Sequence, residues 1–273
     1  MEILICGTAA AEAWPAIFCH CNACAEARRR GGKNVRSRSG YMIGETVKID
    51  YGPDSTAHSL KYGLAYERLE HLLVSHSHWD HWVPEELTYR KPGFSAIPED
   101  RIVAVFGNEK VFNRADTAIK GEWERHRMRF VRVEPFETVR LNDEISAVPL
   151  RAAHDRSEEC LNWLVESGGK TFLQAHDTGW WPDETWDYLR GRTLDAIVMD
   201  TTNGSIDNER GHMGCEAVRR AKAKLESQGS LAEGCRFVAT HFSHNGKWLH
   251  EDLEAFFGPR GIEVAYDGMN LSL

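Results

Sequence analysis

The segment from residue 72 to residue 82, LLVSHSHWDHW, contains side chains that can bind metal ions. Its four candidate ligands are His76, His78, Asp80 and His81. Imidazole nitrogens and carboxylate oxygens suit zinc, manganese or iron better than calcium. Residues two apart in an extended chain face the same way, so His76 and His78 can bind one ion. Asp80 and His81 lie further round the turn and can point at a second ion. We prefer this interpretation to a solvated turn rich in histidine, because unpartnered buried charge is costly.

Three cysteines, Cys19, Cys21 and Cys24, form a second candidate metal site. Their C-x-C-x-x-C spacing can place three thiolates around one ion, whereas structural zinc requires four ligands. His20 lies between two of the cysteines and is poorly placed to be the fourth ligand, so we expect a histidine that is distant in sequence. The alternative is a group of buried or redox-active thiols, because spacing alone does not establish a metal site.

The H-x-H-x-D-H pattern of residues 76–81 resembles the signature of the metallo-β-lactamase-fold hydrolases. The resemblance implies an α/β fold, a four-layer αββα sandwich with two catalytic divalent metals (Zn, Mn or Fe) at one edge. It implies one ion held by His76, His78 and His154, a second held by Asp80, His81 and His241, and Asp177 as the bridge between them. An aspartate in the place of Asp50 supports the ligands of this family by hydrogen bonding.

Two further positions indicate a branch of that family. An aspartate at the place of Asp177, rather than a cysteine, is typical of the phosphodiesterases and thioesterases and not of the lactam-hydrolysing branch. His212, in the loop Arg210-Gly-His-Met-Gly, is similar to a histidine that approaches the substrate in the cyclic phosphodiesterases. The near-neutral pKa of an imidazole suits proton transfer there. We therefore expect Asp80 and His212 to have catalytic roles.

His244 follows His241 by three residues and can supply the fourth ligand that the cysteine cluster lacks. The combination of C-x-C-x-x-C with H-x-x-H is narrower than the superfamily signature. It resembles the phosphodiesterases associated with carbon–phosphorus lyase, which cleave a ribose cyclic phosphate. The resemblance implies one structural Zn, held by Cys19, Cys21, Cys24 and His244, that joins the N-terminal loop to the loop after the last core strand.

The elements that must position these residues are mostly strands that end directly before them. We expect strands at 1–6, 41–43, 46–49, 71–75, 101–106, 130–133, 145–150, 170–175, 194–199 and 236–240, and helices at 55–70, 84–89, 109–119 and 215–228. His154, Asp177 and His241 each lie just past such a strand, as His76 does. His176 should point away from the site, because side chains alternate along a strand.

A basic segment between residues 28 and 38 stands out in an otherwise acidic chain. One interpretation is a solvated loop, the usual state of a run of like charges. The other is that Arg36, Arg38 or Ser39 approaches a substrate phosphate, because arginine suits phosphate oxygens.

Composition limits the class of protein. A chain of 273 residues with 42% hydrophobic content can bury a large core, and we expect one domain over 1–273. The formal net charge of −8 disfavours nucleic acid as a partner. No apolar run approaches the roughly 18 residues of a membrane span, and the N-terminus does not resemble a signal peptide. Seven cysteines, an odd number, favour a reduced, cytoplasmic setting.

These features predict a binuclear metal-dependent phosphodiesterase acting on a small-molecule phosphodiester, for which a ribose cyclic phosphate is one candidate. The alternatives are a thioester or lactone hydrolase on the same site, an RNase-Z-like nuclease, which the acidic balance weakens, and a non-enzymatic metal-binding or sensing protein. We expect no membrane partner and leave a homodimer open. The sequence does not name the substrate or the resident catalytic metal.

Overall fold

The computed structural model describes the whole chain, residues 1–273. It contains two seven-stranded sheets that face each other. The first sheet, in the order β14-β1-β2-β3-β4-β5-β6, contains β1 (Glu2–Gly7), β2 (Gly40–Ile43), β3 (Val47–Ile49), β4 (His71–Leu73), β5 (Val103–Gly107), β6 (Met128–Arg132) and β14 (Met269–Ser272). The second, in the order β13-β12-β11-β10-β9-β8-β7, contains β7 (Val139–Arg140), β8 (Ile145–Arg151), β9 (Leu161–Ser167), β10 (Lys170–Ala175), β11 (Leu194–Asp200), β12 (Leu231–Thr240) and β13 (Glu263–Val264).

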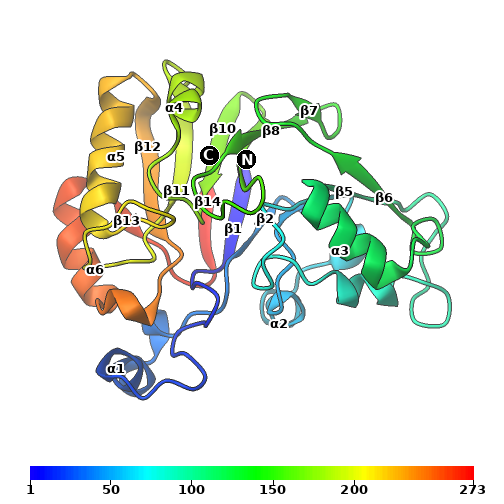
Figure 1. Cartoon of the computed structure of the whole chain (residues 1–273), viewed down its shortest axis with the longest axis horizontal. Helices are drawn as coiled ribbons and strands as arrows, with labels where there is room; N and C mark the ends of the chain where they lie inside the picture. The colour runs from blue at the N-terminus through cyan, green and yellow to red at the C-terminus, as the bar shows by residue number, and fades with distance from the viewer.

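Helices cover the outer faces of both sheets (Figure 1). The α-helices of the chain are α1 (Asn22–Arg30), α2 (Ser55–Tyr62), α3 (Glu109–Ile119), α4 (Asp183–Leu189), α5 (Cys215–Ser227) and α6 (His250–Phe257), of which α1 lies apart from the sheets, at the lower left of Figure 1. Figure 1 shows α2 and α3 beside the first sheet and α5 and α6 beside the second. The arrangement is the expected αββα sandwich, so the predicted fold class is confirmed.

The core has two parts. A cluster of 52 buried residues fills the space between the sheets and continues beneath α5 and α6. A second cluster of 13 buried residues lies between the first sheet and α3, which contributes Val111 and Ala115. Burial of apolar surface on this scale is the main force that holds the layers together. No helix is both long and apolar enough to cross a lipid bilayer.

Most expected elements are present, and the differences have physical causes. The helix expected over 55–70 ends at Tyr62, because Gly63 adopts a left-handed conformation (φ 65°, ψ 36°) that terminates it. Residues 84–89 form a 3-10 helix and not an α-helix. β9 was not expected, since its first five residues are all buried and show no alternation. The short β7, β13 and β14 and the helices α1, α4 and α6 were also not expected.

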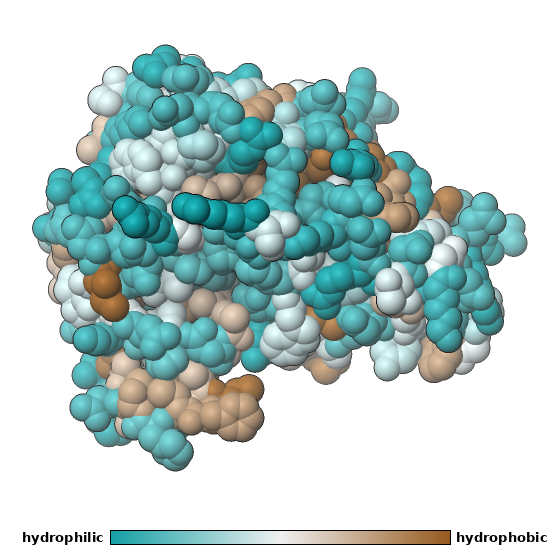
Figure 2. Space-filling view, viewed as in Figure 1, coloured by the Kyte–Doolittle hydropathy of each residue, from teal (hydrophilic) through white to brown (hydrophobic).

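The face seen in Figure 2 is mostly hydrophilic. Apolar atoms gather at its lower left, over the region of α1. Ile17 and Phe18, which directly precede the cysteine cluster, are 66% and 92% exposed.

Candidate metal centre

The candidate catalytic residues meet where parallel strands of both sheets end. Parallel pairing joins β3 to β4 in one sheet and β10, β11 and β12 in the other. Parallel neighbours bring their carboxyl ends to the same edge, where α/β folds commonly bind ligands. Asp50 follows β3, Asp177 lies two residues after β10, Asp200 ends β11 and His241 follows β12.

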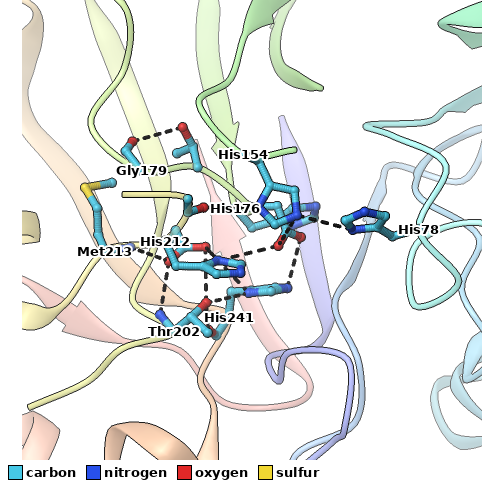
Figure 3. A network of polar contacts seen from close by, with 12 residues as sticks. His78, His154, His176, Gly179, Thr202, His212, Met213 and His241 are labelled. Atoms are coloured by element: carbon cyan, nitrogen blue, oxygen red, sulfur yellow. Dashed lines mark hydrogen bonds and ion pairs between the residues drawn. The ribbon is translucent and has the colours of Figure 1, made fainter. Parts of the chain in front are cut away.

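Three of these residues have an unusual backbone conformation. The φ angles of Asp50, Asp177 and His241 are 59°, 48° and 60°, in the left-handed region that residues other than glycine seldom occupy. Such conformations cost free energy and gather at functional sites. Here they lie at or next to strand ends, where the chain turns. Figure 3 shows the side chains of His154, His212 and His241 close together at this edge.

His76, His78 and His154 form the first group of candidate ligands. One ring nitrogen of each lies within 4.8 Å of those of the other two. His78 Nδ1 and His154 Nε2 face each other at 3.2 Å. His78 can donate Nε2–H to Asp155 Oδ2 at 3.1 Å, and His154 can donate Nδ1–H to the Gly211 carbonyl at 3.1 Å. In these tautomers both facing nitrogens carry lone pairs, and a cation between them satisfies both.

Asp80, His81, Asp177 and His241 form the second group, again within 4.8 Å of one another. Asp177 Oδ2 lies 2.6 Å from His81 Nε2 and 3.1 Å from His241 Nε2. Its other oxygen, Oδ1, lies 3.6 Å from His154 Nε2 in the first group. Asp177 thus presents one carboxylate oxygen to each group.

Several buried nitrogen and oxygen atoms of this centre lack a hydrogen-bond partner, which indicates that the centre can bind metal ions. His76 Nε2, His81 Nε2, His241 Nε2 and Asp177 Oδ2 are buried and have no hydrogen-bond partner. Some of these atoms lie within 3.1 Å of one another, but their geometry is not that of a hydrogen bond. Buried polar atoms are almost always satisfied in folded proteins, so a cluster of unsatisfied ones indicates that these residues can hold a cation. The donor set of imidazole and carboxylate suits zinc, manganese or iron.

Hydrogen bonds behind the ligand layer fix the orientation of the imidazoles. His81 donates Nδ1–H to Asp50 Oδ2 at 2.8 Å, and His241 Nδ1 lies 2.8 Å from the Thr202 hydroxyl. His76 Nδ1 lies 3.0 Å from the Ser75 hydroxyl, which itself donates to Asp50. Each bond holds the proton on Nδ1 and leaves Nε2 free to bind a metal, as such outer partners do in metalloproteins.

Asp50 is the centre of this outer network. It is fully buried and accepts hydrogen bonds from His81, from His176 Nε2 at 2.8 Å, and from the amide and hydroxyl of Ser75. Burial opposes its ionisation, but the charge of His81 and these hydrogen bonds hold the pKa of Asp50 well below its usual range. His176 lies behind the ligand layer and does not line the cavity.

His212 lies over the second group without being part of it. Its Nδ1 is 2.9 Å from Asp200 Oδ2 and 3.6 Å from Asp177 Oδ1. Burial opposes protonation, but the Asp200 carboxylate prevails and raises the pKa of His212 to about 9. Bound divalent cations would act in the opposite direction. The residue type alone predicts a near-neutral pKa for His212. The difference comes from Asp200, a partner that the sequence does not reveal.

The candidate residues surround a cavity of about 380 Å³. Its lining residues are Ala10, Ala11, Glu12, His78, Asp80, His154, Asp177, Thr202, Asn203, His212, His241, Ser243 and Asn245. The lining contains no lysine or arginine. A cavity of this size accommodates a small molecule.

Neither interpretation of the basic segment holds for Arg36, Arg38 and Ser39. All three are buried and do not line the cavity. Arg36 donates to Thr8 Oγ1 and the Ala265 carbonyl, and Arg38 donates to Asp54 and the Ala11 carbonyl. Buried guanidinium groups need hydrogen-bond partners. Through these hydrogen bonds the two arginines hold the N-terminal loop, residues 8–21 between β1 and α1, against neighbouring segments.

The structure also brings together the three clustered cysteines and His244. His244 Nδ1 lies 3.5 Å from both Cys19 Sγ and Cys21 Sγ, and Cys24 completes a set whose ligand atoms all lie within 4.8 Å of one another. Burial opposes ionisation, but hydrogen bonds from the Cys24 amide and from His244 lower the pKa of Cys21 to about 6. All seven cysteines are free of disulfides. Three thiols and one imidazole match a closed structural zinc site.

Sequence reasoning missed several residues that complete the site. Asp155, Thr202 and Asp200 support His78, His241 and His212 respectively. Position in the sequence was the one signal that could have identified two of them: Asp155 adjoins His154, and Asp200 ends an apolar strand. No comparable signal marks Thr202.

Comparison with known proteins agrees with this geometry. Residues 45–242 match a family model described as "Beta-lactamase superfamily domain". No curated protein matches the chain. Three solved structures with the same fold are a diphosphatase from the PhnP family (20% identity, 100% of this chain and 97% of that chain, TM-score 0.76), Zn²⁺-bound PqqB from Methylobacterium extorquens (18%, 100% and 100%, 0.74) and the short form of human tRNase Z (15%, 100% and 99%, 0.67).

Proposed function

Because the chain belongs to the metallo-β-lactamase superfamily of metal-dependent hydrolases, we propose that it hydrolyses a small phosphodiester at a two-metal site. The observation that carries this proposal is the position of Asp177. One of its oxygens faces His154 in the first group and the other faces His81 and His241 in the second. A carboxylate placed in this way suits a bridge between two ions.

The two histidine groups would each hold one ion. His76, His78 and His154 would hold the first, Asp80, His81 and His241 the second, and Asp177 would contact both. When bound, a pair of divalent metals supplies Lewis-acid stabilisation of the charge that builds on the phosphoryl oxygens.

His212 would act on the leaving group. Its Nδ1–H is held by Asp200, so Nε2 is the nitrogen left free to exchange a proton with a substrate. In the protonated state, which the Asp200 carboxylate favours, Nε2–H donates to the leaving oxygen as the phosphorus–oxygen bond breaks. Asp80 lines the same cavity and would help to orient the attacking water.

Several observations favour a phosphodiester. Asp177 occupies the proposed bridging position, where an aspartate is typical of the phosphodiesterases and thioesterases and not of the lactam-hydrolysing branch, and the similar solved structures include a diphosphatase and a tRNase. The cavity of about 380 Å³ suits a small molecule, and a net charge of −8 disfavours a long polyanion such as RNA. A ribose cyclic phosphate is the first candidate to test.

We propose a separate structural role for the thiol site. One zinc ion held by Cys19, Cys21, Cys24 and His244 would join the loop before α1 to the turn after β12. Zinc sites of this composition contribute directly to folding free energy.

The deciding experiment is a substrate panel. Purified protein loaded in turn with zinc, manganese and iron is assayed against bis-p-nitrophenyl phosphate, ribose cyclic phosphates, a thioester and a lactone. We expect hydrolysis of the phosphodiesters, lost in His78→Ala together with bound catalytic metal. Turnover of the thioester or lactone alone would overturn the proposal, as would full activity and unchanged metal content in His78→Ala.

A further inference from the structure

The mouth of the catalytic cavity carries a carboxylate that the proposed reaction does not use. Glu12 lines the cavity beside Ser243 and Asn245, on the side formed by the N-terminal loop. Its Oε1 accepts a hydrogen bond from Ser243 Oγ and lies 3.5 Å from His244 Nε2. Its Oε2 accepts no hydrogen bond from the protein, and about a third of the side chain is exposed. One oxygen is therefore anchored and the other is available to a bound molecule.

The backbone around Glu12 is also fixed. The amide of Ala10 donates to the Phe242 carbonyl at 3.0 Å, and the amide of Phe242 donates to the Thr8 carbonyl at 2.8 Å. These bonds pair the N-terminal loop with the segment that follows β12, which carries His241. Because loop and ligand segment are paired, Glu12 has a defined position relative to the metal centre, and its charge is preorganised.

No lysine or arginine lines the cavity beside Glu12 to offset this charge, and His212, the lining residue that Asp200 keeps protonated, is assigned to the leaving group. The guanidinium of Arg38 is held by Asp54 and by the Ala11 carbonyl, and that of Arg36 is buried against Thr8 and Ala265. Arg210 is exposed and does not line the cavity. A second phosphate or a carboxylate on the non-reacting end of the substrate would thus meet Glu12 with no lysine or arginine beside it, because the metal ions and His212 would serve the reacting phosphate, and like charges at short range repel.

From this arrangement we propose that Glu12 is a specificity-determining residue that selects substrates by the charge of their non-reacting group. That group carries no negative charge and presents a cation or a hydrogen-bond donor to Glu12 Oε2. The substrate is then a singly charged phosphodiester of an amino alcohol or of a neutral polyol, and not a compound with a further phosphate. This inference rests on the proposed phosphodiesterase function.

The test uses three p-nitrophenyl phosphodiesters that share the reacting group and the p-nitrophenolate leaving group. The second alcohol of each ends in a trimethylammonium, a hydroxyl or a carboxylate group. For the metal-loaded wild-type protein we expect kcat/KM to fall in that order. We expect about a tenfold difference between the cationic and anionic esters, because attraction of the first and repulsion of the second each contribute up to about fivefold at a partly exposed charge.

Glu12→Gln removes the charge but keeps an oxygen that can accept from Ser243. We expect this variant to bring the three kcat/KM values within about threefold of one another, with unchanged metal content and melting temperature. Arg210→Gln is the matched control, and we expect it to retain the wild-type order. Calorimetric binding of the three corresponding non-hydrolysable phosphonates, to metal-loaded and to metal-free protein, measures the same order without turnover.

The outcomes separate the two proposals. Equal or inverted preference in the wild-type protein, an order that survives in Glu12→Gln, or loss of catalytic metal in that variant would each overturn the role of Glu12. Failure to hydrolyse any of the three diesters would overturn the proposed function, and the order of phosphonate binding would still decide for or against Glu12.

Discussion

His244 and Glu12 connect the two candidate metal sites. His244 Nδ1 faces the thiols of Cys19 and Cys21 at 3.5 Å, while its Nε2 lies 3.5 Å from Glu12 Oε1 at the mouth of the catalytic cavity. The residue three positions earlier, His241, belongs to the second group of candidate catalytic ligands. One short turn after β12 therefore supplies an imidazole to each site. The conformation of this turn depends on contacts at both sites. The thiol site therefore helps to hold the cavity-lining residues of the turn, His241, Ser243 and Asn245, in place.

The position of Asp177 gives the first prediction. Asp177→Asn replaces a carboxylate oxygen by an amide nitrogen, which cannot bind a metal ion in the same way. We expect the variant to bind fewer catalytic metal ions than wild type and to lose at least about 100-fold in phosphodiesterase kcat/KM, since even outer partners of metal ligands typically contribute 10–100-fold. Metal analysis and steady-state kinetics measure the two effects. Asp195→Asn, which alters a carboxylate paired with Lys170 outside the cavity, is the control and should behave as wild type. Full metal content with full activity in Asp177→Asn would refute the bridging role.

How much of the site could be predicted depends on the range of the contacts involved. His76, His78, Asp80 and His81 lie in one short segment, so their spacing alone indicated a metal site. The proposed role of Glu12 was not predictable, because its partner Ser243 lies 231 residues away. Nothing in the local sequence distinguishes such a glutamate from an exposed one.

The same distinction applies to the fold. α3 was predicted with its bounds, and the structure shows why this helix is well defined: Asn108 caps its first turn by accepting from the Val111 amide, and its apolar residues recur at helical spacing. β9 was missed, since a strand buried on both faces lacks the alternating pattern. Arg36 was misjudged because a charged residue is normally exposed, and its burial depends on acceptors from Thr8 and Ala265.

His212 gives the second prediction. His212→Asn removes the imidazole nitrogen that faces the substrate but leaves both groups of metal ligands intact. We expect catalytic metal content to stay at the wild-type level and kcat to fall by about 10²–10⁴-fold, the usual contribution of a general acid. The loss should be smaller for an ester with a good leaving group such as p-nitrophenolate than for an alkyl ester, because a good leaving group needs less protonation. If His212→Asn loses metal, or if both esters slow equally, the assignment as a proton donor is wrong.

His58 gives a prediction about the pH dependence of stability. It is buried, with Nε2 2.7 Å from the Ser37 hydroxyl. Burial and the nearby positive charge of Lys48 lower the pKa of His58 to about 3. The unfolded chain, with a pKa of about 6.5, binds a proton that the folded chain does not, so this contribution is complete above pH 6.5 and is lost as the pH falls below it.

Between pH 7 and pH 5 the loss from His58 alone amounts to about 2 kcal/mol of unfolding free energy. The measurement is urea unfolding of wild type and His58→Gln at both pH values. Other buried histidines titrate in both proteins, so the difference between the two isolates His58. We expect the variant to lose about 2 kcal/mol less than wild type on acidification. Equal losses would show that His58 takes up its proton in the folded state.

The last prediction concerns the thiol site. Cys21 is the exposed member of the cluster, and its pKa, lowered to about 6, makes it a thiolate at neutral pH. Cys21→Ser removes one of four zinc ligands, and hydroxyl oxygen is a much poorer ligand for zinc than thiolate. The catalytic groups lie outside the cluster and keep all their own ligands.

We therefore expect Cys21→Ser to lose one zinc ion per chain and to melt at a lower temperature, while the molecules that remain folded keep hydrolytic activity. Cys235→Ser, which changes a free cysteine on β12 outside the cluster, is the matched control and should retain all its zinc. Because Cys21 belongs to the N-terminal loop that carries Glu12, whereas His241 keeps its own hydrogen bond to Thr202, KM should change more than kcat in Cys21→Ser. Zinc content measured alongside thermal unfolding decides the matter: equal zinc in Cys21→Ser and Cys235→Ser would mean that the cluster does not hold a metal ion.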